Sequence, residues 1–251
     1  MEALDLKKIY ESRQSAFYKK HWGKLPATFS EVPLLHAADL VRTPLYERLY
    51  KDERGLVKFA SRNNNGFLIR RSLSDIKNNN LELPQDAVPL VLLSDPNEGL
   101  EHSLWCYEYG TVPYIGDLSN LPVTLICASQ FKTNTLISDM AALLEIVSLN
   151  EMPETIKNIY VIDSSFADRA LLKEVQKDYH LKLFLSLPEA GIIASVKPAE
   201  ADRLRLMPQM GVSLEDVDGK IVVTKPELST PLIRYTSDIN MERVEDTLYL
   251  N

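Results

Sequence analysis

The order of apolar and polar positions predicts alternating strands and helices in the middle of the chain. Residues 88–93 form a continuous apolar run, as expected of a buried strand. Asp95-Pro96-Asn97-Glu98 then supplies the cap, proline and acidic first turn of a helix that ends near Gly110. Further strands are predicted at residues 111–115, 123–128, 159–162 and 181–185, and helices beginning at Thr133 or Thr135 and at Ser165. This alternation indicates an α/β fold, with a mostly parallel sheet flanked by helices.

The two ends of the chain show other patterns. Leu6, Ile9, Ala16 and Phe17 have helical spacing and predict an amphipathic helix over residues 4–22. Residues 211–250 consist of short runs broken by turn signals such as Asp218-Gly219, which predicts antiparallel strands. We therefore predict an α/β core over residues 1–197 and a small β-subdomain over residues 198–251.

Composition and charge exclude several classes of function. Of the 251 residues, 45% are apolar and 25% charged, as in an ordinary globular protein. The net charge of −7 argues against nucleic acid as a partner, because phosphate binding depends on clustered lysine and arginine. No apolar run reaches membrane-spanning length, and the acidic N-terminus lacks a signal-peptide pattern. We expect a cytoplasmic protein without a membrane partner, in which Cys106 and Cys127 are reduced.

Two carboxylates follow predicted strands. Glu189 lies in the turn Ser186-Leu187-Pro188-Glu189-Ala190-Gly191, directly after the strand at residues 181–185. Residues 232–235 predict a strand that turns at Thr236-Ser237 and presents Asp238. A carboxylate at a strand end beside a turn is well placed to hold a ribose or a metal ion.

These stretches, in this order, resemble motifs of the adenylate-forming superfamily of AMP-binding acyl- and aryl-acid ligases. Its phenylacetate–CoA ligase-like branch carries a Tyr-Gly-x-Thr-Glu turn, a "GE-l-vvT" strand and a "P-l-i-R-Y-x-T-G-D" segment. Residues 185–189, 219–224 and 231–238 stand at these places, and residues 17–22 resemble the "FYrrhw" opening of that branch. The resemblance covers the last third of the chain well and the middle loosely. It implies a shortened fold of the N-terminal-core type.

The resemblance also implies a nucleotide site for ATP or AMP. The family's phosphate loop corresponds to residues 60–66, and Asp238 corresponds to the carboxylate that binds the ribose. Glu189 corresponds to the Mg²⁺ ligand. The implied nucleotide-binding residues are Ser61, Asn63, Asn64, Asn65, Gly66, Ser164, Ser186, Leu187, Pro188 and Asp238.

Each implied role has a structural alternative. Arg62 stands where the family has a glycine, and asparagines replace threonines, so we favour a hairpin turn between residues 57–59 and 67–69. Pro188 replaces the family's threonine and removes a hydroxyl and a backbone donor. Asp238 caps a turn in the alternative interpretation, since its spacer is one residue short. For Glu189 the alternative is a surface glutamate at a turn, but the order of the motifs favours the Mg²⁺-binding role.

Other side chains divide between structure and substrate. Arg234 in a half-buried strand is expected to pair with an acid. Trp105, Tyr107 and Tyr109, with Tyr114, could line an aryl-acid pocket, although we favour a core position for this cluster.

Two classes of function remain open. In the first, the chain is a divergent acyl-CoA synthetase-like ligase that activates a carboxylic acid, with adenylation impaired or completed by a C-terminal domain on another chain. We expect the family's C-terminal catalytic domain to be absent. The resemblance implies as partners a small carboxylic acid or acyl-adenylate, a carrier protein and a second copy in a homodimer. In the second, it is a non-catalytic binding or scaffold protein, a pseudoenzyme that keeps the fold.

Overall fold

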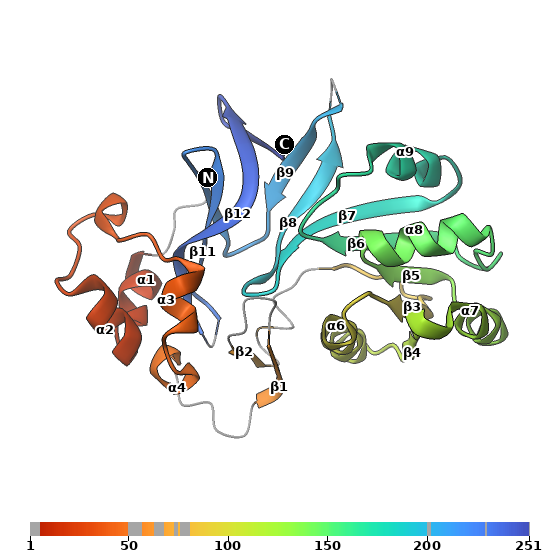
Figure 1. Cartoon of the computed structure of the whole chain (residues 1–251), viewed down its shortest axis with the longest axis horizontal. Coiled ribbons are helices and arrows are strands. Elements are labelled where there is room, and N and C mark those ends of the chain that lie inside the picture. Colours follow the sequence, from red (N-terminus) through yellow and green to blue (C-terminus); the bar gives the residue numbers. More distant parts are fainter. Residues whose placement is uncertain are drawn as a thin grey trace. The chain divides into compact units, whose positions relative to one another are not determined.

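The computed structural model describes residues 6–49, 57–62, 68–72, 75, 81–199, 202–228 and 230–250. Two compact units divide the chain (Figure 1). The parallel unit contains Asn80–Ser186 and Ser195–Asp202; the antiparallel unit contains Met1–Asn79, Leu187–Ala194 and Arg203–Asn251. These units group the N-terminal segment with the C-terminal strands, whereas the sequence analysis divides the chain at residue 198. The predicted domain boundary stays a prediction.

The parallel unit is built on strands in the order β7-β6-β5-β3-β4. All four neighbouring pairs are parallel. The central strands are almost continuously buried, which explains their unbroken apolar runs. Their bounds are β3 Pro89–Leu92, β4 Tyr114–Ile115, β5 Thr135–Ser138, β6 Asn158–Asp163 and β7 His180–Leu187. The predicted helix-flanked parallel sheet is therefore confirmed.

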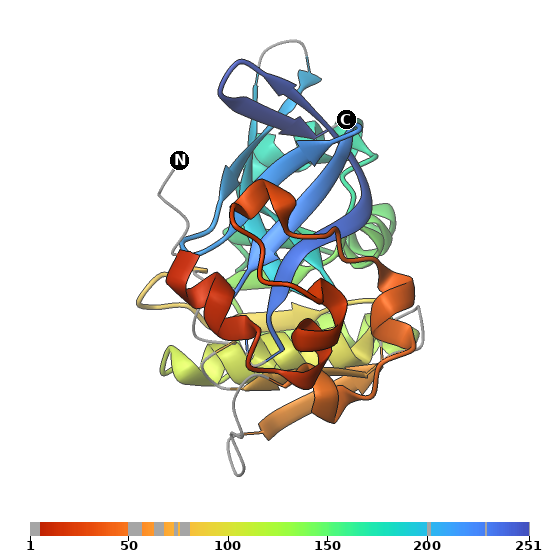
Figure 2. The same ribbon diagram turned by 90° about the vertical axis from the view of Figure 1, so that its left-hand side faces the viewer.

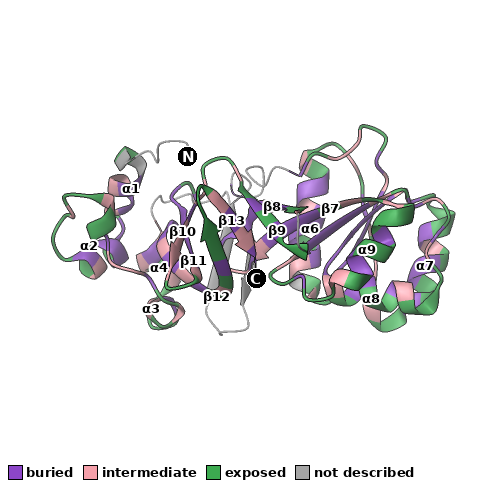
Figure 3. Cartoon of the chain, turned by 90° about the horizontal axis from the view of Figure 1, so that it is seen from above, coloured by how far each residue is buried: buried purple, intermediate pink, exposed green. Residues whose placement is uncertain are grey.

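Helices cover both faces of this sheet. Helix α6 (Pro96–Glu108) lies on one face, and α7 (Leu121–Gln130), α8 (Met140–Leu149) and α9 (Arg169–Asp178) lie on the other (Figure 3). Their inward stripes are buried and their outward sides exposed. Across the sheet, the chain runs from β3 to β4 in one direction, and from β5 through β6 to β7 in the other. The direction therefore reverses between β3 and β5, and open α/β sheets usually place ligands at such a switch point.

Three local predictions in this unit are wrong. Residues 123–128 lie in α7 and not in a strand, because Leu121, Leu125 and Ala128 bury one helical stripe. Neither Thr133 nor Thr135 caps a helix: Thr133 precedes β5 and Thr135 lies in it, and α8 begins after Asp139, whose side chain accepts from the Ala142 N–H. Helix α9 is likewise capped by Asp168 and not by Ser165. Short apolar runs fit a strand and a buried helix equally well, which is the physical source of the first error.

The antiparallel unit contains strands in the order β10-β11-β12-β13-β9. Each neighbouring pair is antiparallel, as predicted for residues 211–250. Strand β12 is the long member, and its pairing with β11 is interrupted at two places. The bounds are β9 Leu204–Pro208, β10 Ser213–Val217, β11 Lys220–Lys225, β12 Leu232–Val244 and β13 Thr247–Leu250, and β8 (Gly191–Pro198) contributes residues to both units.

The N-terminal segment packs on this antiparallel sheet (Figure 2). The predicted helix over residues 4–22 is broken into α1 (Leu6–Ser12) and α2 (Ala16–Trp22), because Ser15 caps the second helix through the Tyr18 N–H. The buried Tyr18 hydroxyl donates to the Pro231 carbonyl at 2.7 Å and accepts from the Ile233 N–H at 3.1 Å. The N-terminal segment also contains the 3-10 helix η1 Phe29–Glu31, α3 Ala37–Val41, α4 Leu45–Arg48 and the antiparallel strands β1 Val57–Arg62 and β2 Leu68–Ser72.

The described part of the chain contains no helix that is both long and apolar enough to cross a membrane. Of the two cysteines, Cys106 is buried and Cys127 half-buried, and both are free thiols. Burial raises the pKa of Cys106 to about 12.

Candidate functional site

The turn that carries Glu189 is fixed from a neighbouring strand. Strand β7 ends at Leu187 and β8 begins at Gly191, whose φ of 66° is a conformation that glycine adopts without strain. The buried ammonium of Lys225 donates to the Ala190 carbonyl at 2.9 Å and to the Ile192 carbonyl at 3.1 Å. Lys225 therefore holds the turn on the antiparallel unit.

The Glu189 side chain is buried, with 6% of its surface exposed. Its carboxylate contacts the hydroxyl of Tyr235 on β12. Burial, followed by the negative charge of Glu189 and then that of Asp238, raises the pKa of the Tyr235 hydroxyl above its ordinary value. The charges of Glu189 and Asp238 therefore both raise the pKa of the Tyr235 hydroxyl, and all three residues belong to the antiparallel unit.

Glu189 also lines a small pocket together with Arg48. The pocket has a volume of about 10 Å³, which is room for about one water molecule. Burial lowers the pKa of Arg48, whose side chain is 5% exposed. The remaining lining residues are Phe17, Leu40, Thr230, Pro231 and Leu232.

This pocket does not fit a magnesium ion. Mg²⁺ prefers six oxygen ligands and usually keeps several waters. The pocket admits about one water and places a guanidinium beside its carboxylate. In the described part of the chain, no three side chains of the metal-binding types gather into a site. We assign no chemical step to a metal here, and the Glu189–Mg²⁺ contact stays a prediction from the resemblance.

Asp238 lies within a strand and not after one. Strand β12 continues to Val244, so the predicted turn at Thr236-Ser237 is wrong. The pairing with β11 shifts instead: Lys220 pairs with Asn240, but Val222 pairs with Thr236. The Ser237 hydroxyl closes this bulge by donating to the Ile221 carbonyl at 3.0 Å. A bulge re-aims side chains, and here the Asp238 side chain is exposed.

The Asp238 carboxylate has no hydrogen-bond or ion-pair partner among the described residues. The Lys220 ammonium bonds the backbone carbonyl of Asp238 at 3.0 Å and leaves the side chain free. An exposed carboxylate of this kind fits the two hydroxyls of a ribose. Asp238 does not line the Glu189 pocket, and the predicted common cleft stays a prediction.

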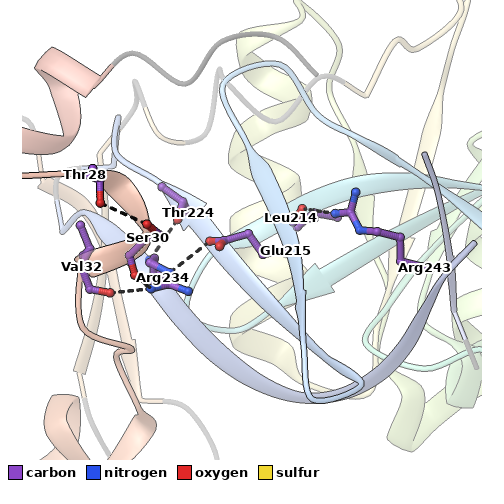
Figure 4. A network of polar contacts seen from close by, with 8 residues as sticks. All are labelled: Thr28, Ser30, Val32, Leu214, Glu215, Thr224, Arg234 and Arg243. Atoms are coloured by element: carbon purple, nitrogen blue, oxygen red, sulfur yellow. Dashed lines mark hydrogen bonds and ion pairs between the residues drawn. The ribbon is translucent and has the colours of Figure 1, made fainter. Parts of the chain in front are cut away.

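Arg234 has the structural role that the sequence predicts (Figure 4). Its Nε lies 3.4 Å from Glu215 Oε1, and its Nη1 donates to the carbonyls of Ser30 at 3.0 Å and Val32 at 2.6 Å. Its φ of 51° marks the second irregularity of β12. The guanidinium thus ties the N-terminal segment and β10 to the strand that carries Asp238.

The other predicted nucleotide-binding residues fall in different places. Ser61 lies on β1, whereas Asn63, Asn64, Asn65 and Gly66 lie outside the described residues. Ser164 is exposed after β6 and Ser186 half-buried in β7, both in the parallel unit. Leu187 and Pro188 belong to the antiparallel unit with Glu189.

The aromatic residues predicted near an aryl-acid pocket differ in burial. Trp105 is buried in the core of the parallel unit, whereas Tyr107 is exposed. The rings of Trp105 and Tyr109 are in contact, with centroids 4.9 Å apart, whereas Tyr114 stacks on Phe131 at 5.2 Å. Residues two apart on a helix do not share a face, so α6 does not present Trp105 and Tyr107 to one ligand, and Tyr109 lies beyond the end of this helix.

Sequence reasoning missed an acidic cluster at the carboxyl ends of β3, β5 and β6. Burial, then the charges of Asp95, Glu101, Asp139 and Asp163, raise the pKa of Glu98 to about 7. Asp139 accepts from the Ser94 N–H at 2.7 Å and also from its hydroxyl, while Asp163 accepts from the Met140 N–H at 2.8 Å. The only sequence signal was the Asp95-to-Glu98 helix start, which indicated a cap.

No protein-family model and no curated protein matches the chain. Solved structures do match. O-succinylbenzoate coenzyme A synthetase from Bacillus subtilis, in complex with AMP, is 14% identical, with 76% of this chain and 48% of that chain covered and a TM-score of 0.55. VinN with L-aspartate is 12% identical, with coverages of 77% and 58% and a TM-score of 0.58.

A third match is NpsA–ThdA from Klebsiella oxytoca, an artificially fused adenylation–PCP di-domain. It is 11% identical, with coverages of 76% and 44% and a TM-score of 0.59. The chain therefore spans about half the length of the solved proteins that it matches. Identities this low establish the fold alone. On that evidence, the chain has the fold of the adenylate-forming enzymes.

Proposed function

We propose that this chain is a divergent acid-ligase-like protein that binds AMP or an acyl-adenylate, with weak or no adenylation of its own. The carrying observation is that Asp238, the residue matched to the family's ribose ligand, is exposed at a bulge with a carboxylate free of partners in the described residues. The fold supports this proposal, and the B. subtilis synthetase of that fold was solved with AMP. The first contact we assign is therefore between Asp238 and the ribose hydroxyls.

Other side chains of the antiparallel unit support the strand that carries Asp238. The hydroxyl of Tyr235 on β12 contacts the Glu189 carboxylate, and Arg234 anchors the same strand four residues before Asp238. The substituted phosphate loop, with Arg62 and three asparagines, weakens the hold on the β- and γ-phosphates. We therefore infer that the chain binds the nucleoside part of ATP more firmly than its β- and γ-phosphates.

AMP and a non-hydrolysable acyl-adenylate are expected to raise the melting temperature at least as much as MgATP. A ligand that binds only the folded state stabilises it by about 2.7 kcal/mol at a hundredfold excess over Kd. Asp238→Ala should remove the shift, because it deletes a charge-assisted contact of about 1.5–3 kcal/mol. Thermal unfolding with each ligand at millimolar concentration measures this.

The matched control is Asp246→Ala, which removes another exposed aspartate of the same unit. This variant should keep the full AMP shift. A larger shift with MgATP than with AMP would show that the asparagine-rich loop binds phosphates after all. If none of the three ligands changes the melting temperature, the nucleotide proposal is wrong and the scaffold alternative is favoured.

The purified chain is expected to show no ATP–pyrophosphate exchange above background with aryl or fatty acids. Loss of one preorganised donor to developing charge costs about 10²–10³ in rate, and both the phosphate loop and Pro188 depart from the family pattern. Isotope exchange with benzoate, phenylacetate and octanoate tests this. Robust exchange that is lost in Glu189→Ala would establish an active ligase and contradict the prediction.

A carrier protein is the partner we propose for an acyl-adenylate-binding chain. One solved protein of this fold is an adenylation domain fused to a PCP domain, and this supports a carrier-protein partner. We keep a scaffold role as the second candidate, because Arg62 and Pro188 alter two of the family's nucleotide motifs. Nucleotide-dependent stabilisation separates the two.

A further inference from the structure

Helix α7 of the parallel unit has an exposed side without charge. The helix contains no charged residue, whereas α6, α8 and α9 of the same unit each contain at least one. On its outer side Val123 is 50% and Ile126 59% exposed, and Phe131, directly after the helix, is 62% exposed (Figure 3). A helix that is apolar on all sides is normally buried on all sides. The outer side of α7 therefore indicates a surface that a partner covers.

The same surface extends to the edge of the sheet. Tyr114 of the edge strand β4 is half-buried, and its ring stacks on that of Phe131 with centroids 5.2 Å apart. The centres of protein interfaces are poor in charged residues and rich in aromatic ones, and this surface has that composition. We call Tyr114, Pro122, Val123, Ile126 and Phe131 the α7 patch.

Opposite charges stand at the two ends of the patch. Asp117 precedes α7 and Lys132 follows it, and residues 118–131 between them carry no charged side chain. Both side chains are exposed. The Asp117 carboxylate accepts from the N–H and hydroxyl of Ser119 through the same oxygen, Oδ1, at 2.9 Å and 2.7 Å. Neither Asp117 nor Lys132 has an ion-pair partner among the residues that the structure describes.

This order of charges is complementary to itself when the direction of the helix is reversed. Two copies of α7 that meet side by side in opposite directions are related by a twofold axis, the commonest symmetry of soluble oligomers. Asp117 of one copy then lies beside Lys132 of the other, and the same contact is repeated across the axis. Ile126, close to the middle of the uncharged stretch, lies near that axis. The charges therefore select a second copy of this chain as the partner.

We propose that the α7 patch is the contact surface of a twofold dimer of this chain, with the two α7 helices antiparallel and Asp117 of each copy paired with Lys132 of the other. A helix rises about 1.5 Å per residue, so α7 is only about 15 Å long. Stable interfaces usually bury about 800 Å² on each partner, more than one helix face of this length provides. The dimer is therefore weak and forms as the protein concentration rises. It does not depend on nucleotide binding.

Sedimentation equilibrium from micromolar to millimolar protein is expected to show a monomer–dimer equilibrium. Ile126→Asp should raise the dimer Kd at least about tenfold, because two carboxylates would then face each other near the axis. Its exposed position lets the variant fold normally. The matched control is Val41→Asp, which places the same charge at an exposed valine of α3 in the antiparallel unit and should leave the dimer Kd unchanged.

Exchange of the end charges tests the antiparallel arrangement. Asp117→Lys puts lysine at both ends of the patch, and Lys132→Asp puts aspartate at both ends. Each variant alone should dimerise about tenfold more weakly than the wild type, because both end contacts become repulsive. An equimolar mixture of the two should recover the wild-type association, because every lysine then meets an aspartate. Thermal unfolding checks that each variant is folded, since Asp117→Lys also removes the hydrogen bonds to Ser119.

Three results would show that the proposal is wrong. The first is a monomer at every concentration, and the second is a dimer that Ile126→Asp leaves intact, because another surface would then form it. The third is a mixture that associates no better than its two components. Asp238→Ala tests the nucleotide site separately and should dimerise like the wild type, so failure of one proposal leaves the other standing.

Discussion

Replacing Arg234 by alanine is expected to lower the free energy of unfolding by about 1.5–3 kcal/mol, because it removes a half-buried ion pair and the charged donor of two hydrogen bonds. The Arg234 side chain is 13% exposed and its partner Glu215 is 26% exposed. The substitution would leave Glu215 without its cation and the carbonyls of Ser30 and Val32 without their donor. Urea unfolding, compared at the midpoint and slope, measures the change.

Arg243→Ala is the matched control. Arg243 is an exposed arginine of the same strand, and its bond to the Leu214 carbonyl has the limiting length of 3.5 Å. Its loss should change the free energy of unfolding by less than about 0.5 kcal/mol. A similarly small effect of Arg234→Ala would contradict the structural role assigned to the network in Figure 4.

The stability of the parallel unit is expected to fall as the pH rises from about 4.5 to about 7, with Glu98 contributing up to about 3 kcal/mol. The folded state holds the Glu98 proton more tightly than the unfolded state, because burial and the charges of Asp95, Glu101, Asp139 and Asp163 oppose ionisation. Below pH 4.5 both states are protonated. Above pH 7 both are ionised, and the loss is complete.

Glu98→Gln isolates this contribution. The variant carries no charge and should be more stable than the wild type at pH 8, with the difference disappearing near pH 4. Buried His102, whose pKa is lowered by burial, acts in the opposite direction by favouring unfolding in acid, and it does so in both proteins. Measuring the difference between the two proteins therefore removes its effect.

The control is Glu145→Gln on the exposed side of α8. The difference in the free energy of unfolding between this variant and the wild type should be the same at pH 4 and pH 8. A Glu98→Gln difference that is the same at pH 4 and pH 8 would show that Glu98 is not held in its protonated form by the acidic cluster.

The two carboxylates named from the motifs have different surroundings, and this bears on the proposed function. Glu189 is buried against Tyr235 and lines the Arg48 pocket, whereas Asp238 is exposed and free among the described residues. A carboxylate must reach solvent to bind a nucleotide that comes from solution. We therefore base nucleotide binding on Asp238 and give Glu189 the supporting position.

The sequence by itself determined those features that are recorded locally. The strand at residues 88–93 and the helix beginning at Asp95 carry their own periodicity and caps, and both are found. The motif order led to the adenylate-forming fold, and a charge in an apolar strand indicated that Arg234 would pair with an acid. Such inferences succeed because the interacting residues, or the pattern that they repeat, lie close together along the chain.

Only the tertiary structure decided the rest. Residues 123–128 form a helix because a stripe of α7 packs on the sheet, which a short apolar run cannot specify. Asp238 is exposed because β12 pairs out of register with β11, and Glu189 meets Tyr235 through a contact between distant segments. The pKa of Glu98 depends on carboxylates at the ends of three strands. Register, burial and charge proximity are properties of the folded chain, because each arises from residues that only folding brings together.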